Sequence, residues 1–313
     1  MLNYNLIYNP IFITCFFITF IFVLLFIYFF YYNYIKTINF EIQNIQPKTP
    51  KVITYYNHSL IDKYPVNNNK FPEFKNATSY KVELNPGDSL FIPAGWWHWV
   101  FSQDNCIAFS HIIHNFDEDA ITEKQSHNYK EKTIKYYNYN NRNYIDFIKH
   151  STESMPLVYN NPNLNKLTQF FLEQTLDKAN IMISKSNTIN SVNKPGNTTM
   201  LIINGKYKYF NILNNSYNYY CYIGMMPLDK EKFICFINND WNTFANTNNN
   251  KNDIYLWHSK KNIDTGLHYD ITDNLLTVHS GKKTIMLFPP SEKKYLYNKL
   301  LNNINNFGCF IQH

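Results

Sequence analysis

The sequence predicts a mainly β protein with flanking helices, built as a jelly-roll barrel and preceded by one transmembrane helix. Two regions, residues 84–100 and 254–290, consist of short β-prone segments separated by tight turns. A third feature is the uncharged apolar segment 11–32 near the N-terminus. The chain has 313 residues, of which 45% are apolar and 17% charged, so wholesale disorder is excluded.

The first strand region reads LNPGDSLFIPAGWWHWV. Residues 85–88 predict a turn, and residues 89–92 predict a short strand. A second turn at residues 93–95 is followed by another strand over residues 96–100, whose tryptophans we expect to pack inside the barrel. Such short strands joined by tight turns are typical of a jelly roll.

The rest of the chain alternates between polar segments and segments with a regular apolar pattern. Residues 116–142 are polar and predict a linker. Residues 144–150 predict a short helix and residues 156–159 a strand, whereas apolar side chains recur at helical spacing over residues 164–176. Strands return over residues 254–290.

The N-terminal segment 11–32 is long enough for one helix to cross a bilayer, which needs about 20 apolar residues. No basic region precedes it and no small-residue cleavage site follows it, so we expect residues 1–36 to be a retained anchor. Lys36, Lys48 and Lys51 follow the segment, which favours a cytosolic location for the remainder of a single-pass membrane protein. The alternative is a helix buried in the protein core. It is less favoured because no face of this segment is polar.

The charge pattern does not indicate a nucleic-acid partner. The net charge is +6, but lysines and arginines are scattered and form no dense basic block of the kind that follows phosphates.

A candidate metal motif lies at His268 and Asp270, which are two residues apart. On a β-strand they point to the same face. An imidazole and a carboxylate on one face supply two ligands of the 2-His-1-carboxylate triad that holds non-haem Fe(II). The pair alone is a weak signal, since most such pairs are structural, so the surrounding sequence decides.

That surrounding sequence resembles the Jumonji C, or cupin-8-like, family of Fe(II)- and 2-oxoglutarate-dependent oxygenases. The segment LWHSKKNIDTGLHYDITDNLLTVHSGKKTIMLFPPSEKKYLY, residues 256–297, is similar to the family's first metal strand and its continuation. GDSLFIPAGWWHWV, residues 87–100, is similar to the later strand that carries the third ligand. The resemblance implies a double-stranded β-helix, the cupin jelly roll, with Fe(II) bound by His268, Asp270 and His98.

The same resemblance implies a site for the co-substrate 2-oxoglutarate. Lys283 matches the lysine that pairs with its distal carboxylate, and Thr265 and Asn274 match a hydroxyl and an amide position. Tyr220 or Tyr222 matches a further contact, and we assign it to Tyr220. No catalytic residue is implied beyond the metal site, and the remaining histidines of both regions are expected to be structural or surface groups, namely His111, His114 and His279.

The order of the two regions differs from that of the family, in which the HxD strand comes first. Residues 143–313 followed by residues 37–115 compose one complete domain, with residues 116–142 joining the former ends. This pattern indicates a circular permutation, which is acceptable because domain termini often lie close together. The alternative is a tandem pair in which each copy has lost its complementary half.

These features predict a membrane-anchored oxygenase of the hydroxylase or demethylase type. The membrane contact is assigned to residues 11–32, and the substrate, a protein or a small molecule, is not specified by the sequence. The alternative is a non-catalytic cupin that serves as a binding or scaffold module at a membrane.

Overall fold

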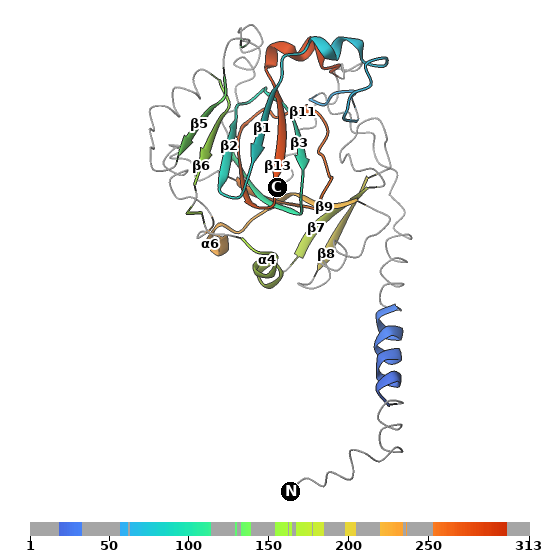
Figure 1. Cartoon of the computed structure of the whole chain (residues 1–313). Helices are drawn as coiled ribbons and strands as arrows, with labels where there is room; N and C mark the ends of the chain where they lie inside the picture. Colours follow the sequence, from blue (N-terminus) through green and yellow to red (C-terminus); the bar gives the residue numbers. More distant parts are fainter. Residues whose placement is uncertain are drawn as a thin grey trace, which may run out of the picture. The chain divides into compact units, whose positions relative to one another are not determined.

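The computed structural model divides into two compact units, residues 1–48 and residues 49–313. The described residues are 19–32, 57–61, 63–113, 129, 133–138, 154–161, 163–164, 167–176, 178–184, 198–204, 220–233, 236 and 253–298. In the first unit, residues 19–32 form a helix, coloured blue in Figure 1. Within the described part of the chain, no helix combines the length and apolar character needed to span a membrane. The predicted transmembrane helix is therefore unsupported, and residues 11–18 of that segment lie outside the described residues.

The second unit is built mainly from β-strands, which the described residues arrange in two sheets (Figure 1). The four-stranded sheet has the order β1 (Tyr80–Leu84), β13 (Lys283–Phe288), β3 (Trp97–Ser102) and β11 (His268–Tyr269). The nine-stranded sheet has the order β5 (Lys135–Asn138), β6 (Leu157–Asn160), β2 (Asp88–Ile92), β12 (Asp273–Ser280), β4 (Cys106–Ile113), β10 (Asp253–Ser259), β9 (Tyr220–Pro227), β7 (Lys178–Ser184) and β8 (Thr198–Asn204). The short helices are η2 (Pro72–Asn76), α4 (Gln169–Thr175), α6 (Lys230–Phe233) and η5 (Pro290–Tyr295).

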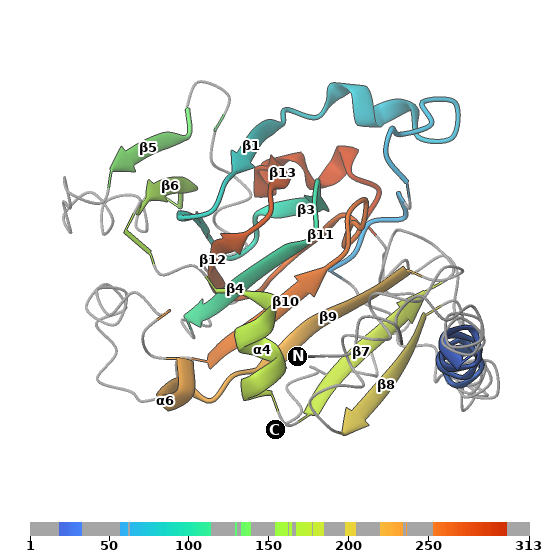
Figure 2. The same cartoon turned by 60° about the horizontal axis from the view of Figure 1, so that its bottom comes forward.

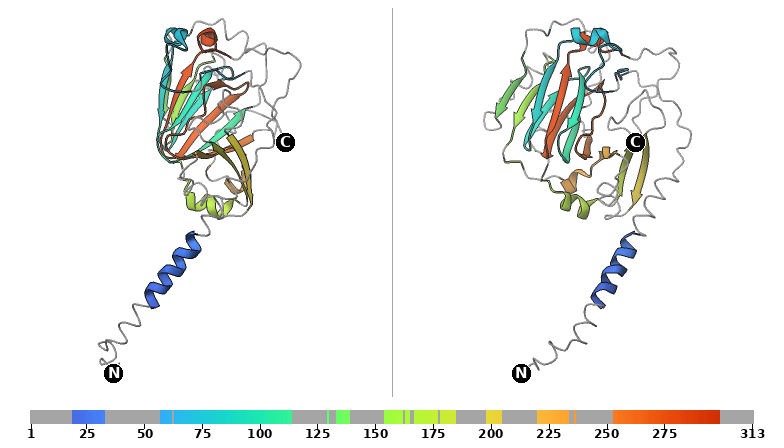
Figure 3. Two further views of the ribbon diagram at one scale, coloured as in Figure 1. Left: turned by 90° about the vertical axis from the view of Figure 1, so that its right-hand side faces the viewer. Right: turned by 45° about the vertical axis from the view of Figure 1, so that its right-hand side comes forward.

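Strands from the two predicted β regions alternate in both sheets. The four-stranded sheet reads β1-β13-β3-β11, and the centre of the larger sheet reads β2-β12-β4-β10. Each sheet thus alternates a strand of residues 80–113 with a strand of residues 253–288, a pattern visible as alternating blue-green and orange-red strands in Figure 3. The two regions therefore complete one jelly roll within a single chain, as predicted, while the circular permutation itself stays a prediction.

The core lies between the inner faces of the two sheets. Alternate residues of each strand point inward because side chains in a strand alternate between faces. The four-stranded sheet contributes Val82, Val100 and Ile285, and the larger sheet contributes Leu90 and Val278, all of them buried. Trp96 belongs to this core, whereas Trp97 and Trp99 are buried in a second apolar cluster on the opposite face of β3. The prediction that the tryptophans pack inside the barrel is therefore confirmed for Trp96 alone.

The short helices α4 and α6 pack on the outer face of the nine-stranded sheet (Figure 2). Phe233 of α6 contacts Phe109 of β4 at a ring-centroid distance of 5.9 Å and Phe171 of α4 at 5.8 Å. His279 of β12 also lies on this face, 4.3 Å from the Phe109 ring centroid. This histidine therefore packs against an aromatic side chain, and its structural role stays a prediction.

The segments between the two β regions are described only in part. The predicted strand at residues 156–159 corresponds to β6, whereas the helix predicted over residues 164–176 is confined to α4, residues 169–175. The predicted linker contributes the buried Tyr129 to the core, and its β5 pairs in parallel with β6. The predicted helix 144–150 lies outside the described residues.

The hairpin between β12 and β13 turns at Gly281, where φ is +73°. A Cβ atom built there overlaps the carbonyl oxygen of Asn105 and lies 2.7 Å from the Cys106 sulfur. Left-handed backbone alone costs a side-chain-bearing residue about 1–2 kcal/mol. This turn therefore requires glycine.

We predict that Gly281→Ala lowers the free energy of unfolding by more than about 1 kcal/mol, measured by chemical denaturation. Lys282→Ala is the matched control, because Lys282 forms an exposed ion pair with Glu83 at 2.9 Å, and such pairs contribute about 0–1 kcal/mol. Unfolding of Gly281→Ala at the wild-type midpoint would contradict this account of the turn.

Candidate metal centre

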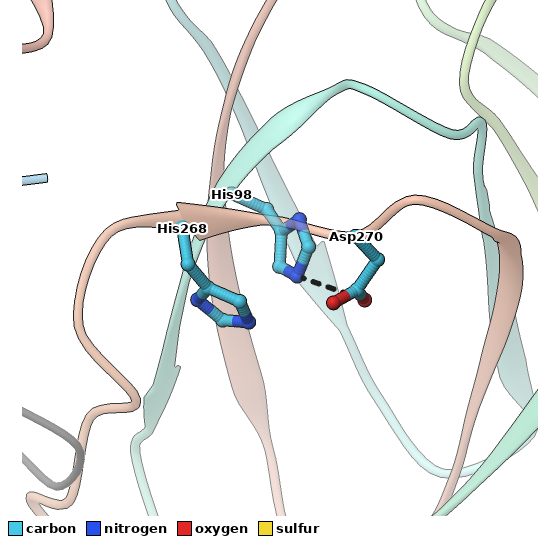
Figure 4. Close-up of side chains that lie close together, drawn as sticks. All are labelled: His98, His268 and Asp270. Atoms are coloured by element: carbon cyan, nitrogen blue, oxygen red, sulfur yellow. Dashed lines mark ion pairs between the residues drawn. The ribbon is translucent and has the colours of Figure 1, made fainter. Parts of the chain in front are cut away.

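The structure brings together the three predicted ligands, His98, His268 and Asp270 (Figure 4). His98 lies on β3 and His268 lies directly opposite on the antiparallel strand β11. Asp270 follows β11, two residues after His268, and its side chain points to the same centre (Figure 4). One potential ligand atom from each residue lies within 4.8 Å of the others. Two imidazoles and one carboxylate thus converge as the sequence predicts.

Backbone carbonyl groups orient both imidazoles. His98 Nδ1 lies 3.0 Å from the carbonyl oxygen of Trp96, and His268 Nδ1 lies 2.9 Å from that of Gly266. A carbonyl oxygen only accepts hydrogen bonds, so each Nδ1 is a donor, and Nε2 is the ring nitrogen left to face a metal. Hydrogen bonding of the second ring nitrogen in this way is typical of histidines that bind metals.

The protonation state of His98 also suits a metal ligand. Its side chain is only 3% exposed, and burial lowers its pKa to about 4, with a further contribution from the charge of His268. The Asp270 carboxylate opposes this shift from 3.6 Å away, measured from His98 Nε2 to Asp270 Oδ2. The imidazole is therefore neutral near pH 7, so a metal ion can bind it without displacing a proton.

A short hydrogen-bond chain holds the Asp270 carboxylate. Asn274 Nδ2 donates to Asp270 Oδ2 at 3.4 Å, and the Asn274 side-chain oxygen accepts from Ser110 Oγ at 2.5 Å. Asn274 lies on β12 and Ser110 on β4, so the central strands of the larger sheet support the ligand. The predicted amide position of Asn274 therefore lies directly beside the metal ligands.

Lys283 is a buried cation in the same barrel. Its side chain is 4% exposed and donates to Ser102 Oγ at 3.0 Å, while Ser102 Oγ lies 2.6 Å from Ser259 Oγ. Burial lowers the Lys283 pKa. Among the ion pairs of the described residues, none joins Lys283 to a carboxylate. Since Lys283 pairs with Ser102, four residues after His98 on β3, both side chains face the barrel interior with the metal ligand.

The other predicted co-substrate residues are placed less completely. Thr265 lies beside β3, where its backbone N–H donates to the Val100 carbonyl at 3.1 Å. Tyr220 begins β9 opposite Ser184, whereas Tyr222 stands opposite Ser259. The side chains of both tyrosines lie outside the described residues, so the assignment to Tyr220 stays a prediction.

Sequence reasoning missed the two serines next to Lys283. Ser102 has a weak signal, because it follows His98 by four positions and shares its face once the predicted strand 96–100 is extended to residue 102, where β3 ends. Ser259 has no such signal, since the pairing of β10 decides its position.

A family model described as a cupin-like domain matches residues 32–119 and 112–308. The JmjC domain-containing protein L887 of Acanthamoeba polyphaga mimivirus is 29% identical over 249 residues, which cover 73% of this chain and 37% of that protein. Lysine-specific demethylase 8 of Xenopus tropicalis is 34% identical over 64 residues, covering 20% of this chain and 14% of that protein. The arginine-specific demethylase JMJ20 of Arabidopsis thaliana is 39% identical over 46 residues, 15% of this chain and 10% of that protein.

The chain thus spans well under half the length of these curated relatives. No solved structure matches it. Because the two matched segments together cover most of the chain and include all three converging side chains, the protein belongs to the family of cupin-like, or JmjC, domains.

Proposed function

We propose that this chain is an Fe(II)- and 2-oxoglutarate-dependent oxygenase of the hydroxylase or demethylase type. The observation that carries the proposal is a neutral His98 beside His268 and Asp270 in a barrel that also buries the cation of Lys283. Relatives named as demethylases support the same reaction class, but their names specify different substrates, lysine and arginine side chains. We therefore propose no particular substrate.

The donor set of the candidate metal centre fits non-haem Fe(II). Two imidazole nitrogens and one carboxylate oxygen are the ligands of the facial triad, which leaves positions for other ligands. His98, His268 and Asp270 would hold the ion, and the carbonyl groups of residues 96 and 266 would keep both rings oriented.

Lys283 fits the distal carboxylate of a dicarboxylate co-substrate. A buried cation without a paired carboxylate is unfavourable unless an anion meets it. Ser102 accepts a hydrogen bond from the ammonium group, and Ser259 is hydrogen-bonded to Ser102, so two hydroxyl groups lie near the cation. Thr265 and a tyrosine of β9, assigned above to Tyr220, remain candidates for additional contacts.

The bound iron, together with 2-oxoglutarate and dioxygen, would supply the oxidant for a C–H bond. The chain itself would position the co-substrate through Lys283 and keep water out through the surrounding apolar core, including Val100 and Ile285. Asn274 would hold the Asp270 carboxylate in place.

We propose further that the two β regions are in circularly permuted order. The strict alternation of strands from residues 80–113 and 253–288 supports one complete barrel in each chain, rather than two incomplete copies.

The alternative function, a non-catalytic cupin module, would use the same barrel without turnover.

We predict that Fe(II), added without oxygen, raises the melting temperature of the wild-type chain. A ligand at 100 times its dissociation constant stabilises by about 2.7 kcal/mol. His98→Ala should abolish this rise because the metal loses one of three protein ligands. His279→Ala is the matched control, since it also removes a buried histidine but lies on the outer sheet face. An equal rise in the wild type and His98→Ala would contradict the site.

We predict that Lys283→Ala weakens 2-oxoglutarate binding at least tenfold, or about 1.4 kcal/mol, in calorimetry of the metal-loaded chain. Lys282→Ala should bind normally, because Lys282 points outward to its ion pair with Glu83. The same variants are then supplied with labelled 2-oxoglutarate and dioxygen, and succinate is measured. Wild type and Lys282→Ala should release it, and unchanged binding by Lys283→Ala would refute the co-substrate site. Tight 2-oxoglutarate binding without succinate would favour the non-catalytic module.

We also propose that residues 11–32 attach the chain to a membrane, with the barrel on the cytosolic side. The full chain should remain in the pellet after carbonate washing of membranes, whereas a chain lacking residues 1–36 should be soluble, because the apolar segment is the proposed anchor. Recovery of the intact full chain in the supernatant would contradict the anchor.

A further inference from the structure

A third histidine lies in the same cross-strand row as the two metal-centre histidines. His58 forms an isolated antiparallel bridge with His268, which in turn pairs with His98. Directly opposite residues of neighbouring strands share one face of a sheet. The His58 ring lies parallel to that of His268, with an interplanar angle of 18° and a centroid distance of 5.2 Å. On its other side, His268 contacts the His98 ring at 4.3 Å.

The segment that carries His58, residues 57–61, is called the strap here. It lies along the edge of β11 that is not paired with β3. Ser59 N–H donates to the Leu267 carbonyl at 2.9 Å, and Tyr269 N–H donates to the Asn57 carbonyl at 3.0 Å. Asn57 Nδ2 adds a bond to the Tyr269 carbonyl at 2.7 Å. The strap is therefore hydrogen-bonded to the residues before and after His268.

The strap is also fixed on its opposite edge. Ser59 Oγ donates to the Leu296 carbonyl at 2.5 Å, and Leu60 N–H donates to the Tyr297 carbonyl at 2.9 Å. The Ile61 N–H donates back to Ser59 Oγ at 2.9 Å. β11 contains only two residues, so the hydrogen bonds from the strap help to hold it in place.

The His58 ring itself is held in place. It is 7% exposed, and its Nδ1 lies 3.0 Å from the Asn57 side-chain oxygen. A buried, tethered aromatic ring stacked on His268 restricts rotation of that imidazole about its χ2 angle. The Gly266 carbonyl restricts it at Nδ1, and the two constraints together fix the direction in which Nε2 points.

We propose that His58 is a positioning residue of the metal centre, which orients His268 by stacking on its ring. The inference rests on the proposed metal site. His58 is outside the group of converging ligand atoms, so its role differs from that of a fourth ligand. Loss of groups that orient metal ligands typically weakens metal binding about 10- to 100-fold.

The test is a Co(II) titration of the full chain, followed by the visible absorption of the bound ion, which reports coordination geometry. His58→Ala should weaken Co(II) binding at least about tenfold and change the spectrum. His58→Phe should bind nearly as the wild type does, because a planar ring is retained. His279→Ala is the buried-histidine control and should leave affinity and spectrum unchanged.

Wild-type affinity and spectrum in His58→Ala would overturn the inference, as would equal weakening by His58→Phe. Thermal unfolding of the metal-free variants reports whether each folds, and His58→Leu replaces His58→Ala if the latter does not, since leucine fills space without a planar ring. Failure of the wild type to bind Co(II) would instead refute the metal site itself. The two failures are therefore distinguishable.

Discussion

The structure depends on the antiparallel pairing of β11 with β3, which places His268 opposite His98. These two residues lie 170 positions apart in the chain, so no local sequence preference brings them together. The alternation of strands from the two β regions does so, because every strand of one region is hydrogen-bonded to strands of the other. The candidate site therefore exists only when both regions are folded in one barrel.

The barrel interior is divided between an apolar centre and polar side chains that are individually supported. Val82, Val100, Ile285 and Leu287 fill the centre, where burial is favourable. Lys283 is different, because burial lowers its pKa and thus destabilises its charged form. Burial lowers the pKa of His258 to about 4, and the Lys283 charge contributes to this shift. A fold that keeps such a lysine loses stability in the absence of an anion, as is common at functional sites.

Much of the fold was predictable because its signals are local. Gly87 and Gly95 adopt positive φ in the two predicted turns, and the predicted strands 89–92 and 96–100 correspond to β2 and β3. The two-residue spacing of His268 and Asp270 predicted that their side chains meet, although β11 ends at Tyr269, whereas His98 was identified through its resemblance to a family motif. The two segments lie far apart in the chain, and the sequence alone does not show whether they meet in the fold.

The remaining features depend on tertiary contacts that no pattern marks. His58 is recognisable only once the strap is seen beside β11, because its neighbours in sequence carry no metal motif. The core position of Tyr129 and the parallel pairing of β5 arise within a segment whose polar composition predicts a linker. Composition averages over such a segment and misses a single buried side chain.

The central claim is that one barrel binds the metal and 2-oxoglutarate together, and chelation tests it most directly. Fe(II) and 2-oxoglutarate are added to the wild-type chain without oxygen, and the visible absorption is recorded. The account predicts a charge-transfer band that develops only when both are present and disappears in His268→Ala. Absence of the band in the wild type, at concentrations where both bind, or its persistence in His268→Ala would contradict the account.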